Sequence, residues 1–100
     1  MKVPTFYMDA KRIIRGDFDM YLSTKHDLFF RRIIEHITNR LEGIEHGEML
    51  CRIIDEEEQI YELHLPKEGF LKAMEKSLQY FKFIEEYETC GLIEELKKYI

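Results

Sequence analysis

The sequence predicts a helix-rich α+β domain with a C-terminal antiparallel helical hairpin and one β-hairpin. Apolar residues three and four apart over residues 70–100 predict two amphipathic helices. Residues 61–65 alternate between apolar and polar side chains, which is typical of a strand. A length of 100 residues suits one domain spanning 1–100, and a hydrophobic content of 45% argues against disorder.

The helical hairpin is predicted over residues 66–100, with helices at Lys67–Phe83 and Tyr87–Tyr99 and a tight turn at 84–87. Pro66 suits the first turn of the first helix. The two apolar stripes consist of Phe70, Met74, Leu78 and Phe81 in the first helix, and Cys90, Ile93, Leu96 and Ile100 in the second. Two short helices bury each other only partly, so we expect the pair to pack on the rest of the chain.

A further helix is predicted at Lys25–Leu41, within a segment that covers residues 25–44. Ser23 or Thr24 is the expected N-cap, and Gly43 suits the position just after the helix. The apolar stripe consists of Phe29 or Phe30, Ile33, Ile34, Ile37, Leu41 and Ile44. Arg31, Arg32 and Glu35 are expected on the outer face, where ion pairs three or four residues apart add little stability.

Residues 48–65 fit two interpretations. The Glu-rich middle favours a helix, which would make the domain an all-α bundle. The alternation in 61–65, the β-branched residues and the bracketing by Gly47 and Pro66 favour a hairpin instead. The predicted strands are Met49–Ile54 and Gln59–Leu65, joined by a solvated turn at Asp55–Glu58.

Residues 1–24 are predicted to form an arm and a connector. Val3–Tyr7 is β-prone and is a candidate third strand, although Pro4 restricts it to an edge or to a position outside the sheet. A short helix at Ala10–Arg15, capped by Asp9, would carry a basic cluster. Balancing the acidic C-terminal half explains this cluster more simply than phosphate binding does.

The net charge of −5 arises wholly in residues 51–100, which carry seven Lys and Arg against twelve Asp and Glu. This imbalance disfavours direct nucleic-acid binding and permits docking on a basic partner. No apolar run approaches the length of a signal or membrane segment, so we expect a cytoplasmic protein that does not enter the membrane. Cys51 and Cys90 lie among apolar residues, which predicts reduced, buried thiols.

The sequence contains no pattern typical of catalysis or cofactor binding. His26, His36, His46 and His64 are too widely spaced to form a metal-binding motif, and there is no HExxH or CxxC. The five glycines are scattered and form no phosphate loop. We therefore expect no metal, no cofactor, no small-molecule substrate and no enzymatic activity. A cleft lined by several histidines and carboxylates would revive an enzymatic interpretation.

Residues 70–100 resemble the UVR-type motif, a helical hairpin of bacterial excision-repair subunits and of some Clp-protease adaptor proteins. The resemblance rests on the stripe of Met74, Leu78 and Phe81, the segment 85–88, the small pair Cys90 and Gly91, and Ile93. Glu94 stands where the family usually has Arg, and Phe81 where it usually has Ala. The resemblance implies that the hairpin pairs with other helical hairpins and does not catalyse a reaction, and that the small pair lets the helices approach closely.

The predicted function is therefore non-catalytic protein binding through the C-terminal hairpin, with self-association as one form of it. The candidate partner-binding residues are Phe83, Glu85, Glu86, Tyr87, Glu88 and Leu92. Equally, Phe83, Tyr87 and Leu92 could complete the core of the monomer. The alternative function is an acidic inhibitor of the phage or mobile-element type, which would cover a basic nucleic-acid-binding surface. That alternative predicts one continuous acidic face formed by 55–58 and 85–88.

Overall fold

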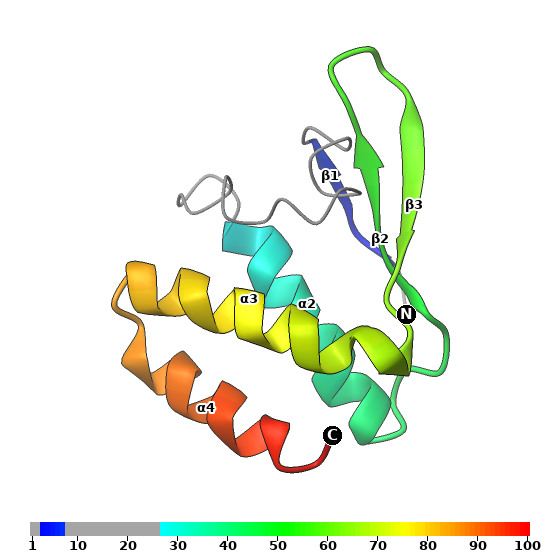
Figure 1. The fold of residues 1–100 in the computed structure, drawn as a ribbon. Helices are drawn as coiled ribbons and strands as arrows, with labels where there is room; N and C mark the ends of the chain where they lie inside the picture. Colours follow the sequence, from blue (N-terminus) through cyan, green and yellow to red (C-terminus); the bar gives the residue numbers. More distant parts are fainter. Residues whose placement is uncertain (1–2, 8–26) are drawn as a thin grey trace.

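A computed structural model describes residues 3–7 and 27–100 and has an α+β fold (Figure 1). Its elements are β1 (Thr5–Tyr7), α2 (Asp27–Leu41), β2 (Met49–Ile54), β3 (Ile60–His64), a 3-10 turn (Lys67–Gly69), α3 (Phe70–Phe83) and α4 (Tyr87–Lys97). The predicted fold class is confirmed, and the all-α alternative is wrong because residues 48–65 form a hairpin. The helix expected at 10–15 and the caps at Ser23 or Thr24 lie outside the described residues.

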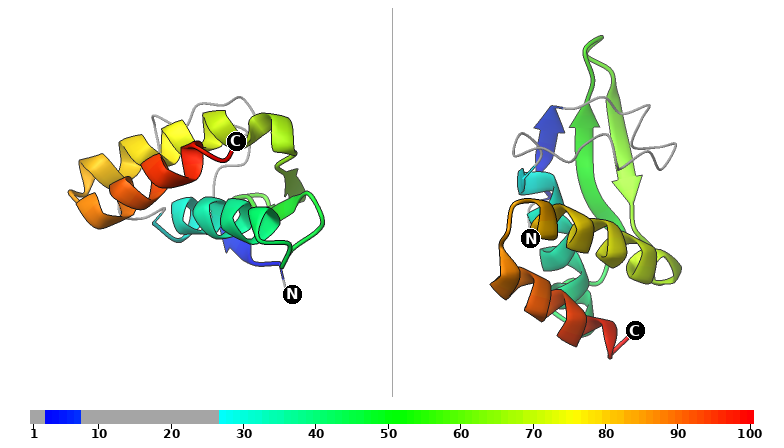
Figure 2. Two further views of the ribbon diagram at one scale, coloured as in Figure 1. Left: turned by 90° about the horizontal axis from the view of Figure 1, so that it is seen from below. Right: turned by 60° about the vertical axis from the view of Figure 1, so that its left-hand side comes forward.

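Helix α2 is the central element of the fold. It packs against β2 on one side and against α3 on the other, and α4 packs on α3 (Figures 1 and 2). The expectation that the helical hairpin needs a surface from the rest of the chain is met by α2. The chain therefore places α4 at the outside of the helical layer, where much of its surface stays open.

The sheet has the order β1-β2-β3, with β1 parallel and β3 antiparallel to β2. The N-terminal arm thus supplies the third strand, in register with β2 through Phe6 and Ile53. Pro4 precedes the strand and needs no ladder donor, while its carbonyl oxygen accepts a hydrogen bond from the Arg52 amide at 2.9 Å. Phe6 turns inward and meets the Phe29 ring edge-on at 6.2 Å.

The β2–β3 turn is closed by a side chain in place of the usual Asn-Gly pair. The Asp55 carboxylate accepts hydrogen bonds from the amides of Glu57 at 2.9 Å and Gln59 at 3.0 Å. Glu58 takes the left-handed conformation with φ at 63°, a region that glycine adopts more readily. Asp55 therefore explains how a Glu-rich segment reverses direction.

Two predicted helix ends differ from the structure. Residues 67–69 form a 3-10 turn before α3, because the Gly69 amide bonds the Pro66 carbonyl at 2.9 Å, three residues back. Helix α4 ends at Lys97, and a turn follows in which the amide of Tyr99 bonds the carbonyl of Leu96. Ile100 is consequently 42% exposed and does not extend the buried stripe.

The core contains most residues of the predicted stripes of the three helices, together with residues of β2. The buried apolar residues are Phe29, Phe30, Ile33, Ile34, Ile37, Leu50, Cys51, Ile53, Phe70, Met74, Leu78, Tyr80, Phe81, Cys90 and Ile93. Leu41 and Ile44 were expected in the α2 stripe but are exposed, because the helix ends between them. Gly43, with φ at 74°, forms the predicted left-handed C-terminal cap.

Both cysteines are buried and unpaired, as the sequence predicts. Burial raises the pKa of the Cys51 thiol to about 12, although the nearby positive charge of Arg32 acts in the opposite direction. A thiol with this pKa stays protonated at neutral pH and is a poor nucleophile. Cys51 therefore acts as a small apolar residue in the core.

Candidate protein-docking site

The turn between α3 and α4 is built on a strained residue. Glu85 has φ at 60°, and the amide of Glu86 donates to the carbonyl of Phe81 at 2.9 Å, five residues back. This is the Schellman arrangement, in which the left-handed position is most often glycine. The Glu85 side chain is exposed and has no hydrogen bond or ion pair with any residue that the structure describes. Backbone strain at an exposed residue is a reason to examine this turn as a candidate binding site.

Replacing Glu85 with glycine is expected to raise the free energy of unfolding by about 1 kcal/mol, because glycine adopts the left-handed conformation without strain. Urea denaturation of both proteins measures the difference. Glu88→Gly is the matched control, since Glu88 lies in the first turn of α4, where glycine destabilises a helix by about 1 kcal/mol. Equal effects of the two substitutions would contradict the role assigned to the turn.

Arg31 of α2 holds this turn in place. Its guanidinium lies 2.6 Å from Glu86 and 2.5 Å from Asp27, and its charge centre sits 5.2 Å from the centre of the Phe81 ring. The Thr89 hydroxyl also donates to Glu86. Arg31 was expected to pair with Glu35 on the outer face, and that expectation is wrong. A partner 55 residues away in the chain leaves no local signal in the sequence.

Glu86 is expected to stabilise the fold above about pH 4.5 and to lose that effect in acid. Hydrogen bonds from Arg31 and then Thr89 lower its pKa from 4.5 to about 2. A depressed carboxyl pKa adds stability that disappears as the pH falls through 4.5 to about 2. Both side chains are partly exposed, so the contribution is about 1 kcal/mol and weakens in salt.

The measurement is urea denaturation of the wild type and Glu86→Gln across this pH range. The difference between them should shrink towards zero at the acid end. Glu88→Gln is the control, because Glu88 is exposed on the same helix turn and has no ion pair among the described residues. A gap that persists unchanged at low pH would show that the carboxylate charge of Glu86 is not the cause.

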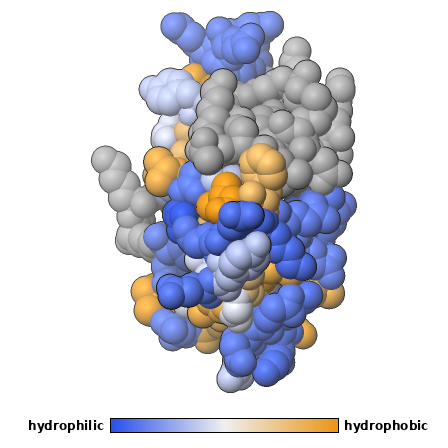
Figure 3. Space-filling view, turned by 90° about the vertical axis from the view of Figure 1, so that its left-hand side faces the viewer, coloured by the Kyte–Doolittle hydropathy of each residue, from blue (hydrophilic) through white to orange (hydrophobic). Residues whose placement is uncertain are grey.

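Three large apolar side chains near the turn face the solvent. Phe83 is 57% exposed, Tyr87 66% and Leu92 50%. Leu92 follows buried Cys90 by two residues, which places it about 200° around the helix and away from the core. Figure 3 looks onto the side of the molecule that carries this turn, where hydrophobic residues lie at the centre among hydrophilic ones. These three residues therefore do not complete the monomer core.

The structure separates the six predicted partner-binding residues into two groups. Phe83, Glu85, Tyr87, Glu88 and Leu92 are exposed, and we call these five the turn surface. Glu86 is half-buried and faces Arg31, so its contacts lie within the chain. Glu86 positions the turn surface from behind, whereas the five exposed residues are available to a partner.

The small pair of the UVR-type resemblance behaves differently from what the resemblance implies. Cys90 is buried between the helices, but Gly91 is exposed. A Cβ atom added at Gly91 would meet nothing within 4 Å. The packing of α3 and α4 therefore does not require glycine at position 91.

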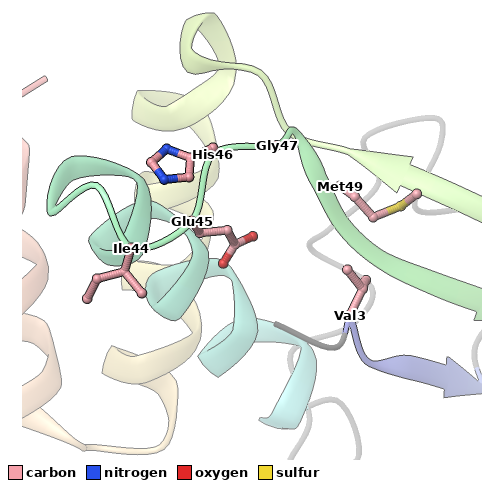
Figure 4. A pocket seen from close by; sticks show the side chains of 6 residues that line it. All are labelled: Val3, Ile44, Glu45, His46, Gly47 and Met49. Atoms are coloured by element: carbon pink, nitrogen blue, oxygen red, sulfur yellow. The ribbon is translucent and has the colours of Figure 1, made fainter.

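A shallow hollow lies beside the loop that precedes β2 (Figure 4). Its volume is about 270 Å³, and Val3, Ile44, Glu45, His46, Gly47 and Met49 line it. The Glu45 carboxylate and the His46 ring leave the loop in different directions, so they do not converge on one point (Figure 4). His36 belongs to the core and His64 to β3, so this hollow does not gather several histidines.

Behind the hollow lies a buried polar cluster. Arg32 donates two hydrogen bonds to the Glu45 carboxylate, at 2.7 and 3.1 Å, and one to the Leu50 carbonyl at 2.7 Å. His36 is fully buried and contacts the same carboxylate at 2.6 Å. Burial alone would raise the pKa of Glu45, but the hydrogen bonds from Arg32 and His36 hold it below its ordinary value.

This cluster corrects one prediction and explains a feature of the fold. Arg32 was expected on the outer face of its helix, yet only 4% of it is exposed. Its contacts join α2 to the loop before β2 and to β2 itself. The Glu45 carboxylate is bound by Arg32 and His36 of α2, so the cluster has a structural role: it holds the loop before β2 against this helix. Within residues 3–7 and 27–100, no three His, Cys, Asp or Glu side chains are placed to hold a metal ion.

Comparison of the chain with protein-family models, curated proteins and solved structures gives no match. None of the described helices combines the length and the apolar content needed to cross a membrane. The class that the fold defines is a small α+β domain, and its turn surface groups three of the exposed large apolar residues.

Proposed function

We propose that this protein is a non-catalytic protein-binding module of the cytoplasm that docks through the turn surface. The observation that carries the proposal is the exposure of Phe83, Tyr87 and Leu92 together near the turn that joins α3 and α4. Aromatic side chains are frequent anchors of protein interfaces, because each buries a large area on binding. The resemblance of residues 70–100 to UVR-type hairpins supports the same role.

The contacts around the α3–α4 turn support a turn surface that is held in place before binding. The Schellman turn at Glu85 and the Arg31–Glu86 ion pair fix both ends of the turn before any partner arrives. A preorganised surface loses less conformational freedom on binding. The partner is either another protein or a second copy of this chain, and the mass of the purified protein distinguishes the two.

Affinity capture from the native host tests the proposal. The double variant Phe83→Ala/Tyr87→Ala is expected to weaken partner capture by at least about tenfold, as truncation of central aromatic anchors does. Leu71→Ala is the matched control, because Leu71 is also an exposed apolar residue of α3 but lies far from the turn. Undiminished capture by the double variant would refute the turn surface as the binding site.

The acidic-inhibitor alternative is less well supported. The β2–β3 turn with Asp55–Glu58 and the α3–α4 turn with Glu85 and Glu88 lie at different ends of the molecule (Figure 1). They do not form the continuous acidic face that this function needs. Charge reversal at Glu85 and Glu88 tests whether the α3–α4 turn alone acts as an acidic inhibitor. That function predicts partner binding that falls steeply with salt and disappears in the charge-reversed variant. Glu86 is avoided because its reversal would also break the ion pair with Arg31.

A further inference from the structure

Strand β3 forms an open edge of the sheet. The order β1-β2-β3 leaves one side of β3 without a neighbouring strand among the described residues, and Figure 1 shows β3 at the margin of the sheet. The side chains of Ile60, Glu62 and His64 are exposed on this strand. An edge strand presents backbone donors and acceptors with which another strand can pair. This edge is distinct from the turn surface, which lies at the junction of α3 and α4.

The ladder between β2 and β3 identifies the backbone groups that face the open edge. Hydrogen bonds of 3.1 and 2.7 Å join Gln59 and Leu65, on either side of β3, to the residues that flank β2. Alternate residues of an antiparallel strand bond to the same neighbour, so the odd-numbered residues between these two also bond to β2. The amides and carbonyls of Glu62 and His64 therefore point away from β2, towards the open edge.

This edge lacks the features that commonly block strand pairing. Natural edge strands are often protected by lysine, proline or a bulge. Residues 60–64 contain neither lysine nor proline, and the irregularity of the β2–β3 ladder lies between Met49 and Cys51 of β2. The opposite edge, β1, has only three residues and follows Pro4. Of the two edges, β3 is therefore the better one for pairing with another strand.

The sequence of β3 is self-complementary in one antiparallel register. A two-fold axis at Leu63 places Glu62 opposite the partner's His64, and His64 opposite the partner's Glu62. The open backbone groups belong to these same residues, so each opposed pair can exchange both of its hydrogen bonds. A two-fold axis at Glu62 would instead place two carboxylates opposite each other, which is destabilising. The side chains therefore favour the axis at Leu63.

The other charge beside Glu62 suits the same register. Arg52 of β2 lies opposite Glu62, at 3.7 Å from its carboxylate, and His64 lies 4.0 Å from it. These long contacts between half-exposed side chains are weak, and a carboxylate can accept several hydrogen bonds. In the paired sheet, Glu62 would lie between Arg52 and the partner's His64, and both of these side chains can donate to it.

We propose that the open edge of β3 pairs antiparallel with β3 of a second copy of this chain, around a two-fold axis at Leu63. Main-chain hydrogen bonds supply the affinity in this mode of association, and the opposed Glu62 and His64 side chains fix the register. Because β3 has only five residues, the interface is small and the dimer is weak.

The dimer would carry two turn surfaces. Figure 1 shows the α3–α4 turn on the side of the molecule opposite β3, so strand pairing leaves this turn uncovered. Two linked binding sites raise the avidity for a partner that offers two matching sites. This consequence rests on the proposed function, whereas the pairing of β3 does not.

Sedimentation equilibrium of the purified full chain, from about 10 µM to about 1 mM, tests the pairing. The mass of the wild type should rise with concentration from that of a monomer towards that of a dimer. His64→Glu should weaken the dimer by at least about tenfold, because it opposes two carboxylates in each pair. The exchange Glu62→His/His64→Glu should restore the dimer, since it keeps the opposed pair and the composition of the chain.

His64→Pro tests the role of the backbone. The His64 amide points to the open edge, so proline at this position is compatible with the fold of the monomer but removes a donor from the interface. This variant should stay folded by circular dichroism and should be monomeric at every concentration. His64→Ala is the matched control, because it removes the side chain but keeps the amide, and it should still dimerise weakly.

Three results would overturn the proposal. They are a wild type that stays monomeric up to about 1 mM, a dimer that persists in folded His64→Pro, and failure of the exchange variant to restore the dimer. A dimer that Phe83→Ala/Tyr87→Ala dissociates would overturn it too, because self-association would then use the turn surface. Loss of partner capture in that double variant, with the dimer intact, supports two separate surfaces.

Discussion

Replacing Arg32 with methionine is expected to lower the free energy of unfolding by about 3–5 kcal/mol, the usual cost of removing one partner of a buried ion pair. Methionine fills a similar volume, so the loss reflects polar contacts. The Glu45 carboxylate would lose two hydrogen bonds in a site where only 10% of its side chain is exposed, and the Leu50 carbonyl would lose its donor. Thermal unfolding should show a decrease in Tm of more than about 10 °C.

A double-mutant cycle separates this explanation from a simple packing defect. Arg32→Met/Glu45→Leu removes both buried charges, so it should cost clearly less than the sum of the two single variants. Arg40→Met is the matched control on the same helix, because Arg40 is only half-buried and donates to one exposed carbonyl, that of Gly47. Additive effects of Arg32→Met and Glu45→Leu would contradict the coupling that the geometry implies.

The regular features of the fold were predictable because they rest on local periodicity. The stripe through Phe70, Met74, Leu78 and Phe81 depends only on the helical repeat, and all four residues are buried. The alternation in 61–65 identified β3, since side chains in a strand alternate between two faces. The β2–β3 turn was harder to recognise, because it has no Asn-Gly or Asp-Gly pair and is closed by backbone hydrogen bonds together with the Asp55 side chain.

Polar contacts between distant segments were not predictable. Arg32 and His36 lie four residues apart beside apolar Ile33 and Ile37, and this position on the stripe was the one available hint of their burial. Their partner Glu45 comes from a loop whose path depends on the tertiary fold. The Arg31–Glu86 ion pair was unpredictable for the same reason. Glu86 was predicted to bind a partner, but its carboxylate binds Arg31 of its own chain.

The sequence also did not decide whether the apolar residues of the turn surface face the solvent or the core. Phe83 lies two residues from Phe81, and Leu92 two residues from Cys90, so helical periodicity places each away from the core-facing stripe. Only the tertiary structure reveals that no other described segment covers them.

Replacing Ile93 with alanine is expected to lower the free energy of unfolding by about 2–4 kcal/mol and to release α4 selectively. Ile93 is fully buried, and only Cys90 among the other residues of α4 is buried as well. Because α4 packs mainly on α3, a cavity at Ile93 weakens the main attachment of this helix. Hydrogen exchange should therefore speed up for α4 amides well before those of α2 and β2.

Leu92→Ala is the control for this prediction, since Leu92 is the adjacent residue but is half exposed and should cost less than about 1 kcal/mol. Ile93→Ala should also weaken binding at the turn surface, because α4 contributes Tyr87, Glu88 and Leu92 to it. Leu92→Ala should weaken that binding without releasing α4. Uniform acceleration of exchange throughout the chain would instead show that α4 unfolds only with the whole domain, and the turn surface would then be as stable as the core.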